Sequence, residues 1–155
     1  MRLKIVTFGT RLPNWVNDGV AEYLKRLPRD WSLDFIELKP EARNHGRSVA
    51  QLLSLEARRI DAATGDAMRV VLDERGQSWT TTELAKHLQN WRAAARDVAL
   101  IIGSADGVDA EFKARADRLW SLSNLTIPHG IARILVIEQL YRAISLINGH
   151  PYHRE

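Results

Sequence analysis

Short, nearly uninterrupted apolar runs alternate along this chain with longer stretches in which apolar residues recur every three or four positions. The runs at residues 3–8, 69–72 and 98–102 are rich in Val, Ile and Leu, which is typical of strands covered by helices on both faces. The run at residues 33–38 contains two charged residues, so we expect it at a sheet edge. Strands that alternate with helices predict an α/β fold with a mainly parallel sheet.

The stretches between these runs have the spacing of amphipathic helices. Apolar stripes cover residues 15–27 and 49–60, each wide enough to bury one helix face. Thr80, followed three residues later by Glu83, is a capping box that opens another helix. Asp109 is expected to cap a further short helix.

The last long helix is predicted over residues 131–147, and it is apolar on more than one side. Such a helix buries its second face in a larger core or against a partner, and we expect a homodimer. With 155 residues, the chain has the length of one domain, residues 1–155. No Gly/Ser linker or internal repeat divides it.

Composition narrows the function classes. The absence of cysteine excludes disulfides, thiolate metal sites and a cysteine nucleophile. No 18-residue apolar stretch occurs, so we expect no membrane span and a cytoplasmic location. Residues 1–59 hold 11 Lys and Arg against 7 Asp and Glu, whereas the remainder holds 11 against 12. This imbalance permits an RNA partner, but a solvated basic face is the more common explanation.

Two polar segments follow apolar runs and are candidate ligand sites. The chain has no P-loop, dinucleotide fingerprint or HExxH zinc motif. Gly103 and Gly107 follow the run at 98–102, where backbone can approach a ligand closely, although an ordinary turn is the alternative. The segment 122–130 ends in Pro-His-Gly and is dense in Ser, Asn and Thr. It either offers main-chain groups to a purine or simply begins the last helix.

Three stretches carry a family resemblance: LIIGSADG at 100–107, WSLSNLTIPHGIARILVIEQLYRA at 120–143 and NGHPYHRE at 148–155. With them the whole chain resembles the bacterial ribosomal RNA large subunit methyltransferase H family, of the SPOUT class. The resemblance implies a trefoil-knotted, homodimeric α/β domain. It also implies methyl transfer from S-adenosylmethionine to N3 of a pseudouridine in 23S rRNA, within the large ribosomal subunit or the whole ribosome.

The same resemblance assigns the cofactor contacts to three segments that follow apolar runs. Ligands commonly bind at such strand ends in open α/β sheets. The implied residues are Leu72, Gly103, Leu122, Ser123, Asn124, Leu125, Thr126 and Ile127.

Methyl transfer from a sulfonium requires alignment of the reactants and no metal, but the acceptor N3 must lose a proton. The candidate proton acceptors are Glu138, His129, His150 and His153. From the family's tail we favour His153, with Arg142 and Glu138 as the other catalytic candidates. Glu138 and Arg142 have the spacing of a helical ion pair, so a structural role is the alternative.

The tail HPYHRE combines an aromatic residue with cations, which suits a stacked base and its phosphate, although terminal fraying is the alternative. We therefore expect Tyr152 and Arg154 to bind RNA, and His129 to bind RNA or shape the cofactor loop. His87 is expected to be structural.

Other features favour packing or remain open. Four tryptophans are expected in the core: Trp15, Trp79, Trp91 and Trp120. A basic group could form an RNA surface or keep the domain soluble: Lys25, Arg26, Arg29, Arg43, His45 and Arg47. Two rival functions remain, a non-catalytic ribosome assembly factor and a SPOUT methyltransferase for another RNA such as tRNA.

Overall fold

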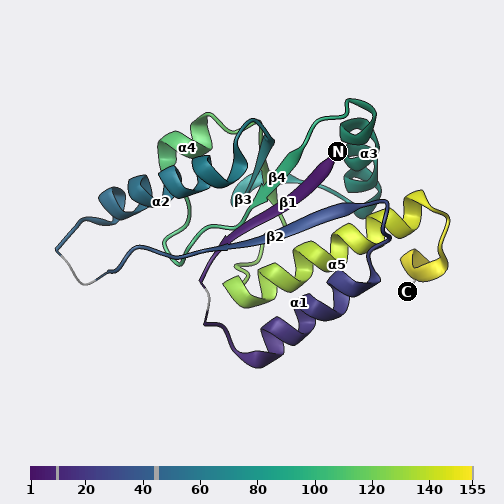
Figure 1. The fold of residues 1–155 in the computed structure, drawn as a ribbon, viewed down its shortest axis with the longest axis horizontal. Coiled ribbons are helices and arrows are strands. Elements are labelled where there is room, and N and C mark those ends of the chain that lie inside the picture. The colour runs from purple at the N-terminus through teal and green to yellow at the C-terminus, as the bar shows by residue number, and fades with distance from the viewer. Residues whose placement is uncertain (10, 44–45, 155) are drawn as a thin grey trace.

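Five parallel strands form one sheet between two layers of helices in the computed structural model (Figure 1). The structure describes residues 1–9, 11–43 and 46–154, with the backbone alone for 153 and 154. The strands are β1 (Arg2–Phe8), β2 (Ser32–Leu38), β3 (Met68–Ser78), β4 (Val98–Ile101) and β5 (Arg118–Ser121). The helices are α1 (Asn14–Arg26), α2 (Val49–Thr64), α3 (Thr81–Ala93), α4 (Ala110–Ala114) and α5 (His129–Ile147), followed by the 3₁₀ turn η1 (Pro151–Arg154).

The sheet has the strand order β2-β1-β4-β3-β5, and every ladder is parallel. The prediction of a mainly parallel sheet is therefore confirmed, and so is the edge position of residues 33–38, which lie in β2. The central strand β4 is completely buried, because helices cover both faces.

Side chains that alternate along the strands divide the core into two layers. Leu3 and Ile5 face a cluster with α1, α3 and α5, whereas Val6 and Phe8 face a smaller cluster with α2 and α4. Figure 1 shows the same division, with α1 and α5 on one side of the sheet and α2 and α4 on the other.

Helix starts follow the caps expected from the sequence. The Thr80 side chain accepts from the Glu83 N–H, and the Glu83 side chain accepts from the Thr80 N–H. Asp109 accepts from the N–H of Phe112. Ser48 and Gln51 form a second capping box at α2, which the sequence analysis missed.

Two elements differ from the sequence prediction. The strand predicted over 69–72 continues to Ser78, although residues 73–78 are mostly polar. This extension pairs with β5 across a register shift between Leu72 and Gln77. Pairing with a distant strand, rather than local hydrophobicity, keeps it extended.

The prediction that Trp15 lies in the core is wrong, because its side chain is 56% exposed. Trp91 and Trp120 are buried as expected, and Trp79 stacks on Trp120. The apolar sides of α5 pack against α1, α3 and the sheet of the same chain. A partner subunit is therefore not needed to explain the composition of α5.

Candidate functional site

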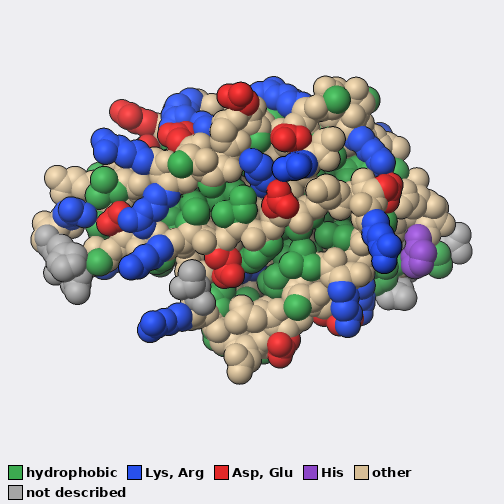
Figure 2. Space-filling model, in the orientation of Figure 1, with side chains coloured by type: hydrophobic (Ala, Val, Ile, Leu, Met, Phe, Trp, Pro, Cys, Tyr) green, Lys and Arg blue, Asp and Glu red, His purple; other side chains and the backbone are tan. Residues whose placement is uncertain are grey.

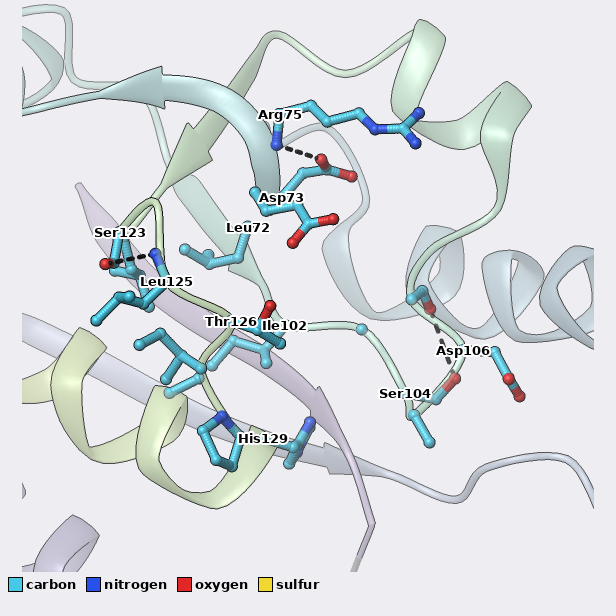
Figure 3. Close-up of a pocket in the computed structure, with 18 of the residues that line it drawn as sticks. Leu72, Asp73, Arg75, Ile102, Ser104, Asp106, Ser123, Leu125, Thr126 and His129 are labelled. Carbon is cyan, nitrogen blue, oxygen red and sulfur yellow. Dashed lines mark hydrogen bonds between the residues drawn. The ribbon is translucent and has the colours of Figure 1, made fainter.

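A cavity of about 680 Å³ opens where the middle of β3 and the carboxyl ends of β4 and β5 meet the start of α5 (Figure 3). Its walls come from residues 72–75, 102–107, 122–123 and 125–129, together with Lys113 and Ala132. The volume lies within the range of small-molecule sites. The position is also the usual one for a ligand in a parallel α/β sheet, beyond the ends of the strands.

Seven of the eight residues assigned to cofactor binding line this cavity. Leu72 comes from β3, Gly103 follows β4, and five come from the loop before α5: Leu122, Ser123, Leu125, Thr126 and Ile127. Asn124 belongs to the same loop but is exposed and is not part of the cavity wall. The fold thus brings together three segments that lie far apart in the sequence.

Hydrogen bonds within the loop at 122–128 fix its shape. Ser121 Oγ donates to the Ser123 carbonyl at 3.0 Å, and the Leu125 N–H donates to Ser123 Oγ at 3.0 Å. The Ser123 hydroxyl is therefore used in a local turn. Pro128 ends the loop as the N-cap residue of α5, with φ of −58°, a value that the proline ring fixes in advance.

Gly103 is required for the turn that follows β4. A Cβ built on Gly103 would lie 2.6 Å from the carbonyl carbon and oxygen of Gly107. The Gly107 N–H donates to the Ser104 carbonyl, and Gly107 has φ of +88°. The two glycines therefore serve first to close a tight turn, and this turn forms one wall of the cavity.

The sequence analysis missed an acidic part of the cavity wall. Asp73 accepts from Lys113 Nζ at 2.9 Å and from the Arg75 N–H at 2.8 Å. Burial raises the pKa of Asp73, but these two donors outweigh burial and hold it below its ordinary value. Glu74 and Asp106 also line the cavity. Ionised carboxylates here suit a ligand with a positive centre, and their position directly after an apolar run was the available signal.

Glu56 of α2 joins the β2–α2 connection to the turn at 103–107. Its side chain is 2% exposed. It accepts from Arg43 Nη1 at 2.8 Å, from Ser104 Oγ at 2.7 Å and from the Glu41 N–H at 2.9 Å. Arg43 also reaches Asp106 at 3.1 Å. We call Glu56, Arg43 and Ser104 the clasp.

Loss of the Glu56 charge is expected to destabilise the fold at neutral pH. Burial raises the pKa of Glu56, but hydrogen bonds from Arg43, Ser104 and the Glu41 N–H outweigh it, so the pKa lies below 4.5. The carboxylate therefore stabilises the fold above pH 4.5, and this contribution disappears as pH falls through the lowered pKa. We expect Glu56→Gln to cost about 1–3 kcal/mol at pH 7, and much less at pH 3, in urea unfolding.

The matched control is Glu22→Gln. Glu22 also pairs with two cations, Lys25 and Arg26, but at an exposed position on α1, where such pairs add little. An equal loss of stability in both variants at pH 7 would contradict the role given to the clasp.

His129, the first residue of α5, lines the cavity and is part of a buried polar network. Arg133, 1% exposed, donates from Nε to His129 Nε2 at 2.9 Å and from Nη1 to Glu37 at 2.8 Å. Its Nη2 donates to the carbonyls of Phe8 and Gly9. Burial, and then the charge of Arg133, lowers the pKa of His129. The imidazole is thus neutral at pH 7, and its Nε2 already accepts a hydrogen bond.

The other catalytic candidates lie elsewhere on α5. Arg142 Nε donates to Glu138 Oε1 at 2.9 Å, as their spacing predicted. The Tyr152 hydroxyl lies 3.3 Å from Glu138 Oε1, and the Arg142 guanidinium lies 4.8 Å from the Tyr152 ring centre. At 1.5 Å per residue, Arg142 is about 20 Å along α5 from His129. We call Glu138, Arg142 and Tyr152 the tail cluster. Within one chain, the tail cluster therefore lies apart from the cavity.

The remaining candidates give a mixed picture. The side chains of His153 and Arg154 lie outside the described residues, as does the whole of His45. His150 is exposed and accepts from the Tyr152 N–H. His87 packs between Trp79, to which its ring is tilted, and Trp91, on which it stacks, a position that agrees with the structural role expected of it.

The predicted basic group is largely paired. Lys25 and Arg26 bind Glu22, Arg47 binds Glu41, and Arg43 belongs to the clasp. These partners reduce the positive potential available to RNA. Over the described residues, no group of three His, Asp or Glu side chains could hold a metal ion, and no helix is long and apolar enough to cross a membrane.

The chain is similar to known proteins over essentially its full length. A family model described as predicted SPOUT methyltransferase matches residues 1–153. Two curated proteins named ribosomal RNA large subunit methyltransferase H are close relatives. The protein from Dechloromonas aromatica is 53% identical over 100% of this chain and 99% of its own length. The protein from Laribacter hongkongensis is 49% identical over 100% of both chains.

Solved structures share the fold at low sequence identity. A probable methylase family protein from Haemophilus influenzae has a TM-score of 0.61 and 14% identity, covering 97% of this chain and 69% of its own. A probable methyltransferase from Bordetella pertussis has a TM-score of 0.60 and 13% identity, covering 92% of this chain and 96% of its own.

Proposed function

The chain belongs to the SPOUT methyltransferase family, and from this premise we propose that it methylates 23S rRNA of the large ribosomal subunit, at N3 of a pseudouridine, with S-adenosylmethionine as donor. Its relatives named for large-subunit rRNA methylation support the substrate, since they match over full length at about half identity. The single observation that carries the activity is the cavity between the middle of β3, the ends of β4 and β5, and the loop before α5. Acting on ribosomes, the enzyme works in the cytoplasm as one domain, residues 1–155.

The residues of the cavity fit the proposed donor. Apolar side chains of Leu72, Leu122 and Ile127 offer a surface for a purine, and the backbone of the loop before α5 can hydrogen-bond its edge. The ionised Asp73, together with Glu74, complements a sulfonium and an ammonium group. We assign donor binding to the seven cavity residues named above, and Asn124 to a supporting place in the same loop.

When bound, S-adenosylmethionine supplies a methyl group on a sulfonium whose sulfur leaves as a neutral thioether. The protein must therefore align the acceptor with that carbon, an effect that can lower a barrier by about 7–11 kcal/mol. It must also accept the proton that N3 loses. His129 is engaged by Arg133 at Nε2, so we assign the proton to His153, with Arg142 and Glu138 assisting.

A homodimer reconciles the distance between the tail cluster and the cavity. Trp15 (56% exposed), Leu125 (73%) and Ile131 (41%) are exposed apolar side chains near the starts of α1 and α5. A Cβ at Gly130 would lie 3.8 Å from the Trp15 ring, so these helix starts adjoin each other at the rim of the cavity. We propose that a second copy covers this rim and that its tail, with Tyr152 and Arg154, binds the RNA. We also propose the trefoil knot of the family around the loop before α5.

The test is methylation of ribosomes from a strain that lacks this gene. Purified protein with S-adenosylmethionine carrying a labelled methyl group should place label in 23S rRNA, and mass spectrometry should identify N3-methylpseudouridine. Label in tRNA instead would show another acceptor. Absence of both methyl transfer and heat of donor binding in calorimetry would show an assembly factor without catalytic activity.

A further inference from the structure

A second cavity, of about 350 Å³, adjoins the first and is not used in the assignments above. It lies beyond the ends of β1 and β2, next to the segment that leads into α1. Ser104, Ala105 and His129 line both cavities. Two cavities with a common wall can hold two reactants side by side, the arrangement that transfer between bound molecules requires.

The walls of the second cavity suit a flat heterocycle. Phe8, Leu12 and Pro40 contribute apolar surface, whereas Glu41, Arg43 and Ser104 contribute polar groups. Sites of this composition bind a ring by its apolar faces and orient it by hydrogen bonds at its edge. The volume lies at the small end of ligand sites, and therefore fits one base better than a complete cofactor.

The wall between the cavities is held rigidly. Arg133 is buried behind it and donates to Phe8, Gly9 and His129, all of which line the second cavity. On the other side, the clasp fixes Ser104 and Arg43 through Glu56. Rigid walls favour alignment because the protein loses little conformational freedom when a ligand binds.

Two exposed cations lie beside the second cavity in sequence. Arg11 and Lys39 are exposed and adjoin two wall residues, Leu12 and Pro40, in sequence. Neither cation has an ion-pair partner in the described part of the chain. Figure 2 shows several Lys and Arg side chains, with Asp and Glu side chains among them, at the end of the molecule that carries the β2–α2 connection. Cations at the mouth of an apolar slot favour a nucleotide, whose phosphates remain outside while the base enters.

We infer, on the premise of the proposed methyltransferase activity, that the second cavity receives the acceptor base, a pyrimidine turned out of its RNA stack. The base and the donor then lie side by side over the residues that line both cavities, Ser104, Ala105 and His129, with the acceptor nitrogen directed toward the methyl carbon. The carbon–sulfur bond breaks as the nitrogen–carbon bond forms, the sulfur leaves as a neutral thioether, and the N3 proton passes to His153, the proton acceptor assigned above.

The test fills the second cavity without changing the first. Leu12→Trp and Pro40→Trp alter residues that line only the second cavity. Each should leave the dissociation constant for S-adenosylhomocysteine within about twofold in calorimetry. Each should lower kcat/KM for ribosomes from the deletion strain at least tenfold, since the base can no longer enter.

Ala93→Trp is the matched control, because it adds the same indole at an exposed position at the end of α3; it should change neither quantity. Pro40 lies in an exposed segment, so it decides the matter if Leu12→Trp does not fold. Wild-type kcat/KM in Pro40→Trp, or loss of product binding in either folded Trp variant, would overturn the inference. Failure of the wild-type protein to methylate rRNA would instead contradict the proposed function.

Discussion

Gly103→Val is expected to abolish donor binding while the protein remains folded. Even a single added Cβ would lie 2.6 Å from the Gly107 backbone, so the turn at 103–107 must open, and this turn is a wall of the donor cavity. We expect the affinity for S-adenosylhomocysteine to fall more than 100-fold, which corresponds to about 2.8 kcal/mol. Titration calorimetry measures the affinity, and circular dichroism confirms the fold. Gly103→Ala should already weaken binding about tenfold.

Gly65→Ala provides the matched control for Gly103→Ala. Gly65 has φ of +52° at the end of α2, but an added Cβ meets no atom within 4 Å. The substitution should therefore cost some stability through backbone strain and leave donor affinity unchanged. Unchanged affinity in Gly103→Val as well would show that the donor binds elsewhere.

Deletion of residues 152–155 is expected to eliminate methyl transfer and spare donor binding. Tyr152 packs on Tyr141, with ring centres 4.5 Å apart, and its hydroxyl lies 3.3 Å from Glu138, midway along α5. The donor site of the same chain does not include these residues. We expect kcat to fall at least 1,000-fold through loss of the proton acceptor and RNA contacts, with an unchanged dissociation constant for S-adenosylhomocysteine.

A mixture of two inactive variants separates a shared site from a tail that acts within its own chain. Gly103→Val chains retain an intact tail, and chains lacking 152–155 retain an intact donor cavity. When the two are co-expressed and the mixed dimers purified, the proposed composite site predicts that activity returns to at most half of the wild-type value. An inactive mixed dimer would confine each tail to its own chain, and full activity of the truncated protein would remove the tail from the mechanism.

Much of the fold could be predicted from the sequence because strand runs and helix caps are determined by residues that lie close together in the chain. The apolar runs of β1 and β4, the Thr80 capping box and the Asp109 cap each depend on neighbours within a few residues. The family resemblance added the residues assigned to donor binding, seven of which line one cavity although Leu72 and Ile127 are far apart in the sequence. The sequence pattern alone did not decide whether the loop before α5 is a ligand site or only the start of a helix.

Features that depend on distant contacts escaped prediction. In the sequence, nothing distinguishes Arg133 from a solvated cation. In the fold it is buried, and it donates to the carbonyls of Phe8 and Gly9 and to the Glu37 carboxylate. Trp15 has core spacing, and yet its ring lies exposed at the edge of the α1–α5 contact. Glu56 depends likewise on partners up to 48 residues away. Such residues are placed by tertiary contacts that no local window contains.

The most direct test of the donor site is a crystal structure of the full chain with S-adenosylhomocysteine. We expect S-adenosylhomocysteine to bind between Leu72, Gly103 and the loop at 122–127, with its sulfur directed toward the wall shared with the second cavity. Product bound at any other place on the chain, or a donor cavity filled by the protein's own side chains at saturating product, would contradict it.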